Sequence, residues 1–173
     1  MQKRQILSEY ELELKKYYFK CFTSEASKTA ILFIISIPVG VIKEFSAALI
    51  LLILLRSNGG GLHLKHYFSC LLTSFLFLYG SIFLALYIQP AKIVICACMI
   101  LFAIMAYDLV PVTSPNRPAA TALQIKRSRR NTFIIISFIF VLICICPVSN
   151  YSYICFWTVL LHIFQLLAAH LRR

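Results

Sequence analysis

Long apolar runs separated by short polar segments dominate the chain. Six such runs lie at about residues 29–42, 45–55, 66–88, 91–110, 132–147 and 151–171. The third, fourth and sixth reach about 20 residues, enough for a helix to cross a hydrocarbon core of ~30 Å. The first two are shorter, and Lys43 and Glu44 separate them. They are therefore either two short helices or one helix with an ion pair near its middle.

The segment that precedes the first run is polar and charged. Apolar side chains recur at roughly helical spacing in residues 4–22, which predicts a helix that lies on the membrane surface or docks on the bundle; a plain solvated helix is the alternative. No cleavable signal peptide is expected, because residues 1–28 contain no early apolar core. We predict an all-α polytopic membrane bundle of about six transmembrane or re-entrant helices plus an N-terminal amphipathic helix.

Composition supports a membrane location. Hydrophobic residues make up 61% of the 173 residues and the mean hydropathy is +0.85, whereas soluble domains are nearer half apolar. One small core could not bury this much apolar surface, so lipid must solvate much of it. The seven cysteines are an odd number and most lie in apolar runs, so we expect neither a disulfide scaffold nor a zinc site. No His, Glu or Asp cluster suggests another metal or a cofactor.

The distribution of charge favours one topology. Lys and Arg number 17 against six acids; between apolar runs, their expected partners are anionic lipid headgroups and not nucleic acid. Six spans place 15 of them on one side of the membrane and two on the other, whereas five spans divide them almost evenly. Because positive residues favour the cytoplasm, we predict six spans with both termini cytoplasmic, and a partly re-entrant hairpin at 29–55 stays open.

Most of the candidate chemistry lies between Arg56 and Cys70, in the run RSNGGGLHLKHYFSC. A thiol nucleophile needs an imidazole to take its proton, and a nearby cation also favours the thiolate. His66, four residues before Cys70, would share a helical face with it. His63, seven residues before, could reach Cys70 only from a loop that folds back, which the three glycines permit. Spacing alone leaves a structural role for these residues open.

Other polar residues in the apolar runs give weaker signals. His162 stands alone in the last run, and an ionisable group inside a span is a functional candidate by default. We expect it to donate or accept a hydrogen bond with a neighbouring helix. The CxC pairs at 96/98 and 144/146 point to opposite sides of a helix, so neither pair chelates a metal by itself.

These segments predict one membrane domain, 1–173. The chain begins with a cytoplasmic amphipathic arm (1–28), followed by two short spans or a hairpin (29–55). A candidate active-site loop enters the third span (56–70), and the rest of the third span and the fourth span follow (71–110). A basic cytoplasmic loop (111–131) leads to the last two spans (132–173).

The pattern G-G-x-H-x6-C ahead of an apolar helix resembles the accessory gene regulator B (AgrB) family, membrane cysteine endopeptidases of bacterial quorum sensing. Arg56, Gly61, His63 and Cys70 match the family's positions. The run PVTSPNRP (Pro111 to Pro118) is similar to the family's loop pattern, a proline followed by N-[KR]-P. The motifs cover 56–70 and 111–118, and the length and the apolar segments agree over nearly all the rest.

The resemblance implies a reaction and a substrate. Cys70 would be the nucleophile and His63 its base; Arg56 and Gly61 would bind substrate or support the oxyanion, and His66, which the family does not require, is an accessory candidate. The substrate would be a short AgrD-like precursor peptide, cleaved through an acyl-thioester and cyclised to a thiolactone or lactone. No cofactor or metal is implied.

The resemblance also implies a place in the cell. The protein would lie in the bacterial cytoplasmic membrane, in contact with lipid, with both termini and the active site on the cytoplasmic side. A bundle this small allows a homodimer, although no residue demonstrates one. Two other functions stay open on the sequence: a small multipass transporter, and a non-catalytic membrane partner protein.

Overall fold

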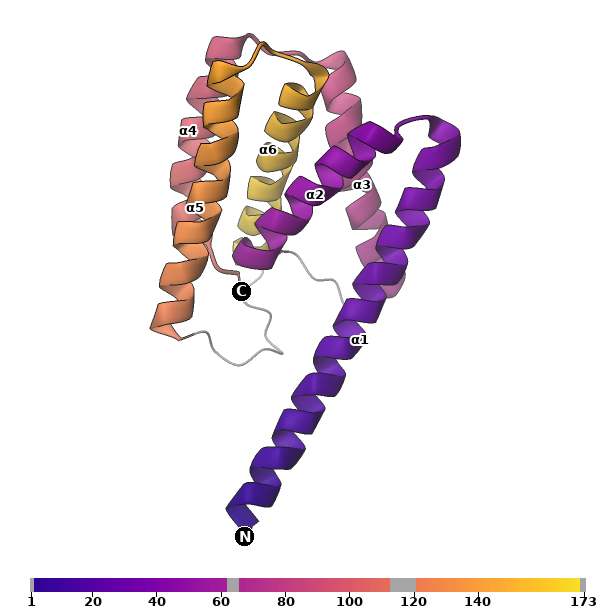
Figure 1. Ribbon diagram of the computed structural model, residues 1–173, viewed down its shortest axis with the longest axis vertical. Helices are drawn as coiled ribbons and strands as arrows, with labels where there is room; N and C mark the ends of the chain where they lie inside the picture. The colour runs from indigo at the N-terminus through magenta and orange to yellow at the C-terminus, as the bar shows by residue number, and fades with distance from the viewer. Residues whose placement is uncertain (1, 62–65, 113–120, 172–173) are drawn as a thin grey trace. The chain divides into compact units, whose positions relative to one another are not determined.

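The computed structural model describes residues 2–61, 66–112 and 121–171. These residues form six helices and no β-sheet (Figure 1): α1 (Gln2–Val39), α2 (Ile42–Gly59), α3 (Tyr67–Tyr87), α4 (Lys92–Leu109), α5 (Ala122–Ile145) and α6 (Asn150–Leu171). The predicted all-α class is confirmed. The chain divides into two compact units, Met1–Ile42 and Lys43–Arg173, and we describe each by itself.

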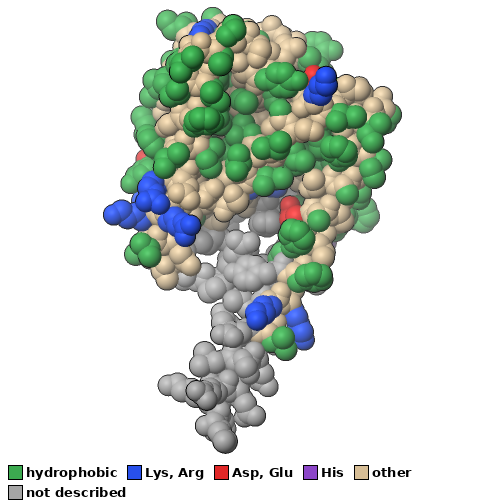
Figure 2. All heavy atoms as spheres, viewed as in Figure 1, with side chains coloured by type: hydrophobic (Ala, Val, Ile, Leu, Met, Phe, Trp, Pro, Cys, Tyr) green, Lys and Arg blue, Asp and Glu red, His purple; other side chains and the backbone are tan. Residues whose placement is uncertain are grey.

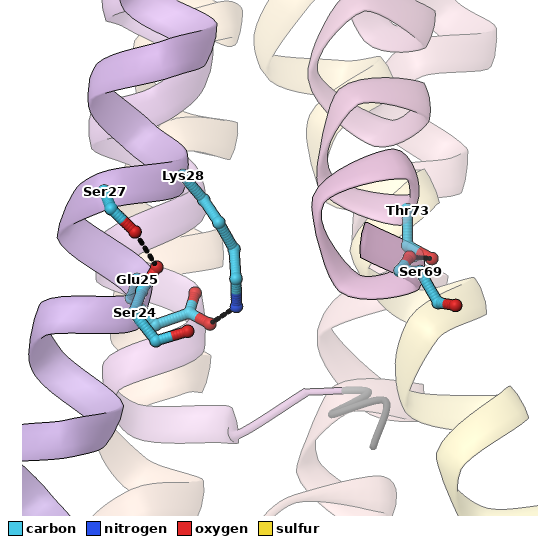
Figure 3. A network of polar contacts seen from close by, with 6 residues as sticks. All are labelled: Ser24, Glu25, Ser27, Lys28, Ser69 and Thr73. Atoms are coloured by element: carbon cyan, nitrogen blue, oxygen red, sulfur yellow. Dashed lines mark hydrogen bonds and ion pairs between the residues drawn. The ribbon is translucent and has the colours of Figure 1, made fainter. Parts of the chain in front are cut away.

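Helix α1 joins the N-terminal arm and the first apolar run. Its 38 residues extend over about 57 Å, and only Cys21–Val39 is apolar enough to cross a membrane. The arm is therefore not a separate helix, because no glycine or proline interrupts the junction between polar and apolar residues. Local contacts support this junction: Lys28 Nζ pairs with Glu25 Oε1 at 2.8 Å, and Ser27 Oγ donates to the Ser24 carbonyl at 3.0 Å (Figure 3).

A Schellman motif ends α1 before the predicted break. Gly40 adopts a φ of 76°, its N–H donates to the carbonyl of Ile37, and the N–H of Val41 donates to that of Ser36. Helix α2 begins at Ile42, with Glu44 in its first turn, where the helix dipole favours an acid. The first two apolar runs are thus separate helices, and the alternative of one helix through Lys43 and Glu44 is wrong.

Five helices are long and apolar enough to span a membrane, and α2 is not among them. The apolar stretch of α2 runs from Phe45 to Leu55, about 16 Å of helix, which is roughly half the thickness of the hydrocarbon core. Within the segment 29–55, α1 is thus part of a helix long and apolar enough for a full span, and α2 is not. A short or partly re-entrant path for α2 stays a prediction.

The second unit is a bundle in which α4 packs against α5 and α6, and α3 packs against α6 (Figure 1). Leu55, Met99, Ile136, Val159 and Leu166 lie in its buried apolar core. Large apolar side chains also cover its outer surface (Figure 2), as expected for helices solvated by lipid. Each predicted apolar run after α2 corresponds to one helix, but α5 begins at Ala122, so the second half of the predicted loop 111–131 is helical.

Candidate active site

Cys70 lies one turn into α3. Its side chain is 4% exposed, and its backbone N–H donates to the carbonyl of His66 at 3.1 Å. All seven cysteines are described and none forms a disulfide; of these, only Cys70 is buried. The next turn is regular, with Thr73 Oγ1 donating to the Ser69 carbonyl (Figure 3).

The two candidate bases differ in what the structure describes. His63 and Lys65 lie outside the described residues. His66 is the N-cap of α3 with φ −96° and ψ 137°, and its side chain is exposed. Because the backbone of His66 is extended, the helical spacing that would place its ring over Cys70 does not extend to this residue. The pairing of either imidazole with Cys70 stays a prediction.

Arg56 and Gly61 are brought together at the end of α2. A Cβ on Gly61 would lie 3.1 Å from Arg56 Nε and 3.5 Å from Arg56 Cγ, so the arginine side chain packs directly on the glycine. The carbonyl of Arg56 accepts a hydrogen bond from the Gly60 N–H at 3.0 Å. Two residues that the family resemblance singled out thus form one contact.

The glycine run is hydrogen-bonded to the start of the second motif, the run from Pro111 to Pro118 that resembles the family's loop pattern. The Val112 N–H donates to the Gly59 carbonyl at 3.0 Å. Gly60 has a φ of 78°, and a Cβ on it would collide with the Val112 carbonyl oxygen. Only glycine fits this conformation and this approach. The remainder of the second motif, from residue 113, lies outside the described residues.

Helix α5 holds both segments in place through side chains that sequence analysis missed. Ser128 Oγ donates to the Asn58 carbonyl at 2.7 Å, and Asn131 Nδ2 donates to Asn58 Oδ1 at 3.0 Å. Arg129 Nε donates to the Val110 carbonyl at 3.0 Å. The available signal was the three-residue spacing of Ser128 and Asn131, which places two uncharged polar groups on one helical face within a basic run.

His162 and Gln165 on α6 face the same turn. His162 Nε2 lies 3.2 Å from the position of a Cβ on Gly59, and Gln165 Oε1 lies 3.6 Å from that of a Cβ on Gly61. Both side chains are fully buried, and neither has a hydrogen-bond partner among the residues that the structure describes. Among the described residues, the hydrogen bond expected from His162 to a neighbouring helix is therefore not formed, because Gly59, which has no side chain, faces the ring.

The candidate site holds no cluster of metal ligands in the parts of the chain that the structure describes: no three His, Cys, Asp or Glu side chains lie close enough to bind an ion. The polar groups near Gly59–Gly61 are instead an arginine, an amide and an imidazole. Such groups bind peptide and carboxylate by hydrogen bonding and charge.

The fold and these residues define a polytopic helical membrane protein with a buried cysteine at the head of a span and a polar turn packed into the same bundle. Over residues 1–166 the chain matches the family model of accessory gene regulator B, and it belongs to this family. No curated protein and no solved structure matches it. The resemblance drawn from 56–70 and 111–118 is thus confirmed over essentially the whole chain.

Proposed function

We propose that this protein is a membrane cysteine endopeptidase that cleaves an AgrD-like precursor peptide and promotes its cyclisation to a quorum-sensing signal. Membership of the AgrB family supports an AgrD-processing role. The observation that carries the proposal is the hydrogen bond between Val112 and Gly59. It joins the two family motifs at the turn from which the chain continues to Cys70.

The proposed reaction has two acyl transfers. The Cys70 thiolate attacks the carbonyl carbon of a peptide bond near the C-terminal end of the precursor, after His63 has taken the thiol proton. His63 then gives this proton to the leaving amine, and the N-terminal fragment stays on Cys70 as a thioester. A thiol or hydroxyl within that fragment attacks the thioester, closes the ring and releases the Cys70 thiolate.

Arg56 is the proposed anion-binding residue. Packed on Gly61, its guanidinium stands next to the turn that leads to the active-site segment, where it can bind the carboxylate-bearing tail of the peptide or the oxyanion of the tetrahedral intermediate. A position of the site at the membrane boundary would limit the access of water, which would otherwise hydrolyse the thioester before the ring closes.

The proposed location is the bacterial cytoplasmic membrane, with the active site and both termini on the cytoplasmic side. Exposed Lys126, Arg127 and Arg130 lie near the start of α5, and basic side chains gather at this end of the unit (Figure 2). Ser128 and Asn131, on the same helix segment, contact the Asn58 turn. These cations are suited to attract lipid headgroups and an acidic peptide.

The test is reconstitution in liposomes with the short precursor peptide encoded beside the gene. Mass spectrometry would compare the products of the wild type, Cys70→Ala, His63→Ala and His66→Ala. We expect cleavage by the wild type and His66→Ala and none by the other two. Cleavage that survives in Cys70→Ala would reject the peptidase and turn attention to transport.

A further inference from the structure

Two buried polar side chains on α6 have no role in the proposed reaction. His162 and Gln165 lie about one helical turn apart and are both 0% exposed. None of their four side-chain nitrogen and oxygen atoms has a hydrogen-bond partner among the residues that the structure describes. Buried polar groups in folded proteins are nearly always hydrogen-bonded, so each exception calls for an explanation.

Packing does not explain these residues. Their neighbours on α6, Val159, Ile163 and Leu166, belong to the apolar core, and a leucine or methionine would fill similar volume without a desolvation penalty. A buried imidazole and a buried amide in such a core are therefore costly unless another group satisfies them during function.

The position of their polar atoms indicates which group that is. They face the backbone of Gly59 and Gly61, with His162 Nε2 at 3.2 Å and Gln165 Oε1 at 3.6 Å from the respective Cβ positions. Arg56 Nε lies 3.1 Å from the Gly61 position. An imidazole, an amide and a guanidinium thus converge on one turn, beside the segment that leads to Cys70.

We propose that His162 and Gln165 form a subsite that binds a main-chain amide of the peptide substrate when the Gly59–Gly61 turn gives up the hydrogen bond from Val112 to Gly59 and shifts away from them. A primary amide and a neutral imidazole each present both a donor and an acceptor, as a peptide bond does. A carboxylate would leave their acceptors unsatisfied. The proposal rests on the proposed peptidase function, since it names how that same site holds its substrate.

The test measures binding separately from cleavage. In the full-length Cys70→Ala protein, the affinity for the fluorescently labelled precursor peptide would be compared between the parent, Gln165→Leu and His162→Leu. We expect each leucine variant to raise Kd about tenfold or more, with an unchanged or higher thermal midpoint. Phe164→Leu, at a lipid-exposed position of the same helix, is the matched control and should leave Kd unchanged.

Peptides in which one amide at a time is replaced by an ester identify the bound group. One such ester peptide should bind the parent with a higher Kd than the all-amide peptide. For that ester peptide, Gln165→Leu should not raise the Kd any further. Two results would overturn the subsite and leave a buried water as the partner of these groups. One is a Kd that stays at the parent's value in both leucine variants while their thermal midpoint rises. The other is a series of esters in which no position weakens binding. Wild-type protein that binds the peptide but does not cleave it would reject the peptidase function and leave the binding result standing.

Discussion

The backbone N–H of Val112 donates to the carbonyl of Gly59 across 3.0 Å and ties the end of α4 to the end of α2. Next to this bond, Ser128 and Asn131 of α5 both donate hydrogen bonds to Asn58. The arrangement gives each glycine of the run a different reason to be glycine. Gly59 faces His162 and Val110, Gly60 faces the Val112 carbonyl, and Gly61 faces Arg56.

Gly60→Ala should destabilise the protein more than Gly40→Ala. Both glycines have positive φ, at 78° and 76°, but a Cβ on Gly60 collides with the Val112 carbonyl and one on Gly40 meets nothing within 4 Å. We expect a loss of about 1 kcal/mol for Gly40→Ala from the backbone conformation and about 3 kcal/mol for Gly60→Ala. Unfolding in detergent measures the difference, and equal losses would argue against the Gly60–Val112 contact.

Gly61→Ala should impair processing more than it impairs folding. The added methyl would lie 3.1 Å from Arg56 Nε and force the guanidinium to shift. We expect peptide processing to fall at least about tenfold with a thermal midpoint close to that of the wild type. Gly80→Ala is the control, because its Cβ would make only ordinary contact with Leu161 at 3.9 Å. Equal processing by both variants would contradict the role of the Arg56–Gly61 contact.

Asn58 and Asn131 should be energetically coupled. Asn131 Nδ2 donates to Asn58 Oδ1 at 3.0 Å between α5 and α2. A double-mutant cycle with alanine at both positions should give a coupling of roughly 1 kcal/mol. A cycle between Asn58 and Gln124, whose side chain accepts from the Thr121 N–H at the start of α5, should give none. Additive effects at Asn58 and Asn131 would argue against this contact.

The packing of α4 against α5 can be tested by cross-linking. Cys96 Sγ and Cys144 Sγ lie 3.7 Å apart, and a disulfide would need them to close to about 2.05 Å. Diamide should oxidise the two thiols to a disulfide, itself being reduced to the hydrazine, and non-reducing peptide mapping should show the linked pair. Cys96→Ser should abolish the link and Cys98→Ser should not; a link that needs Cys98 would contradict the register.

The sequence predicted most helices well because hydropathy is a local signal, and the runs at 66–88, 91–110 and 151–171 each form one helix. The break before α2 lies at Gly40, ahead of Lys43 and Glu44, which had left one helix or two open. The continuity of α1 was missed because a change from polar to apolar side chains does not end a helix when good helix formers span the junction.

The candidate site was only partly predictable. Cys70 is a candidate from its spacing to the histidines, whereas Arg56 and Gly61 were singled out by the family resemblance within the same short segment. The contacts of Gly59 with Val112, of Asn58 with Asn131 and of Gly61 with Gln165 join residues far apart in the chain, and no local pattern encodes them. The hydrogen bond expected for His162 is not formed among the described residues, because its ring faces Gly59 at the end of α2, a neighbour that no local pattern predicts.

Detection of an acyl-thioester on Cys70 tests the central claim most directly. A precursor peptide whose internal nucleophile is replaced by alanine would be mixed with the reconstituted wild type, and the protein's intact mass would be measured. We predict a mass increase equal to the acylated N-terminal fragment, mapped to Cys70 and removed by hydroxylamine. Cleavage without a Cys70 adduct, together with cleavage by Cys70→Ala, would contradict the account.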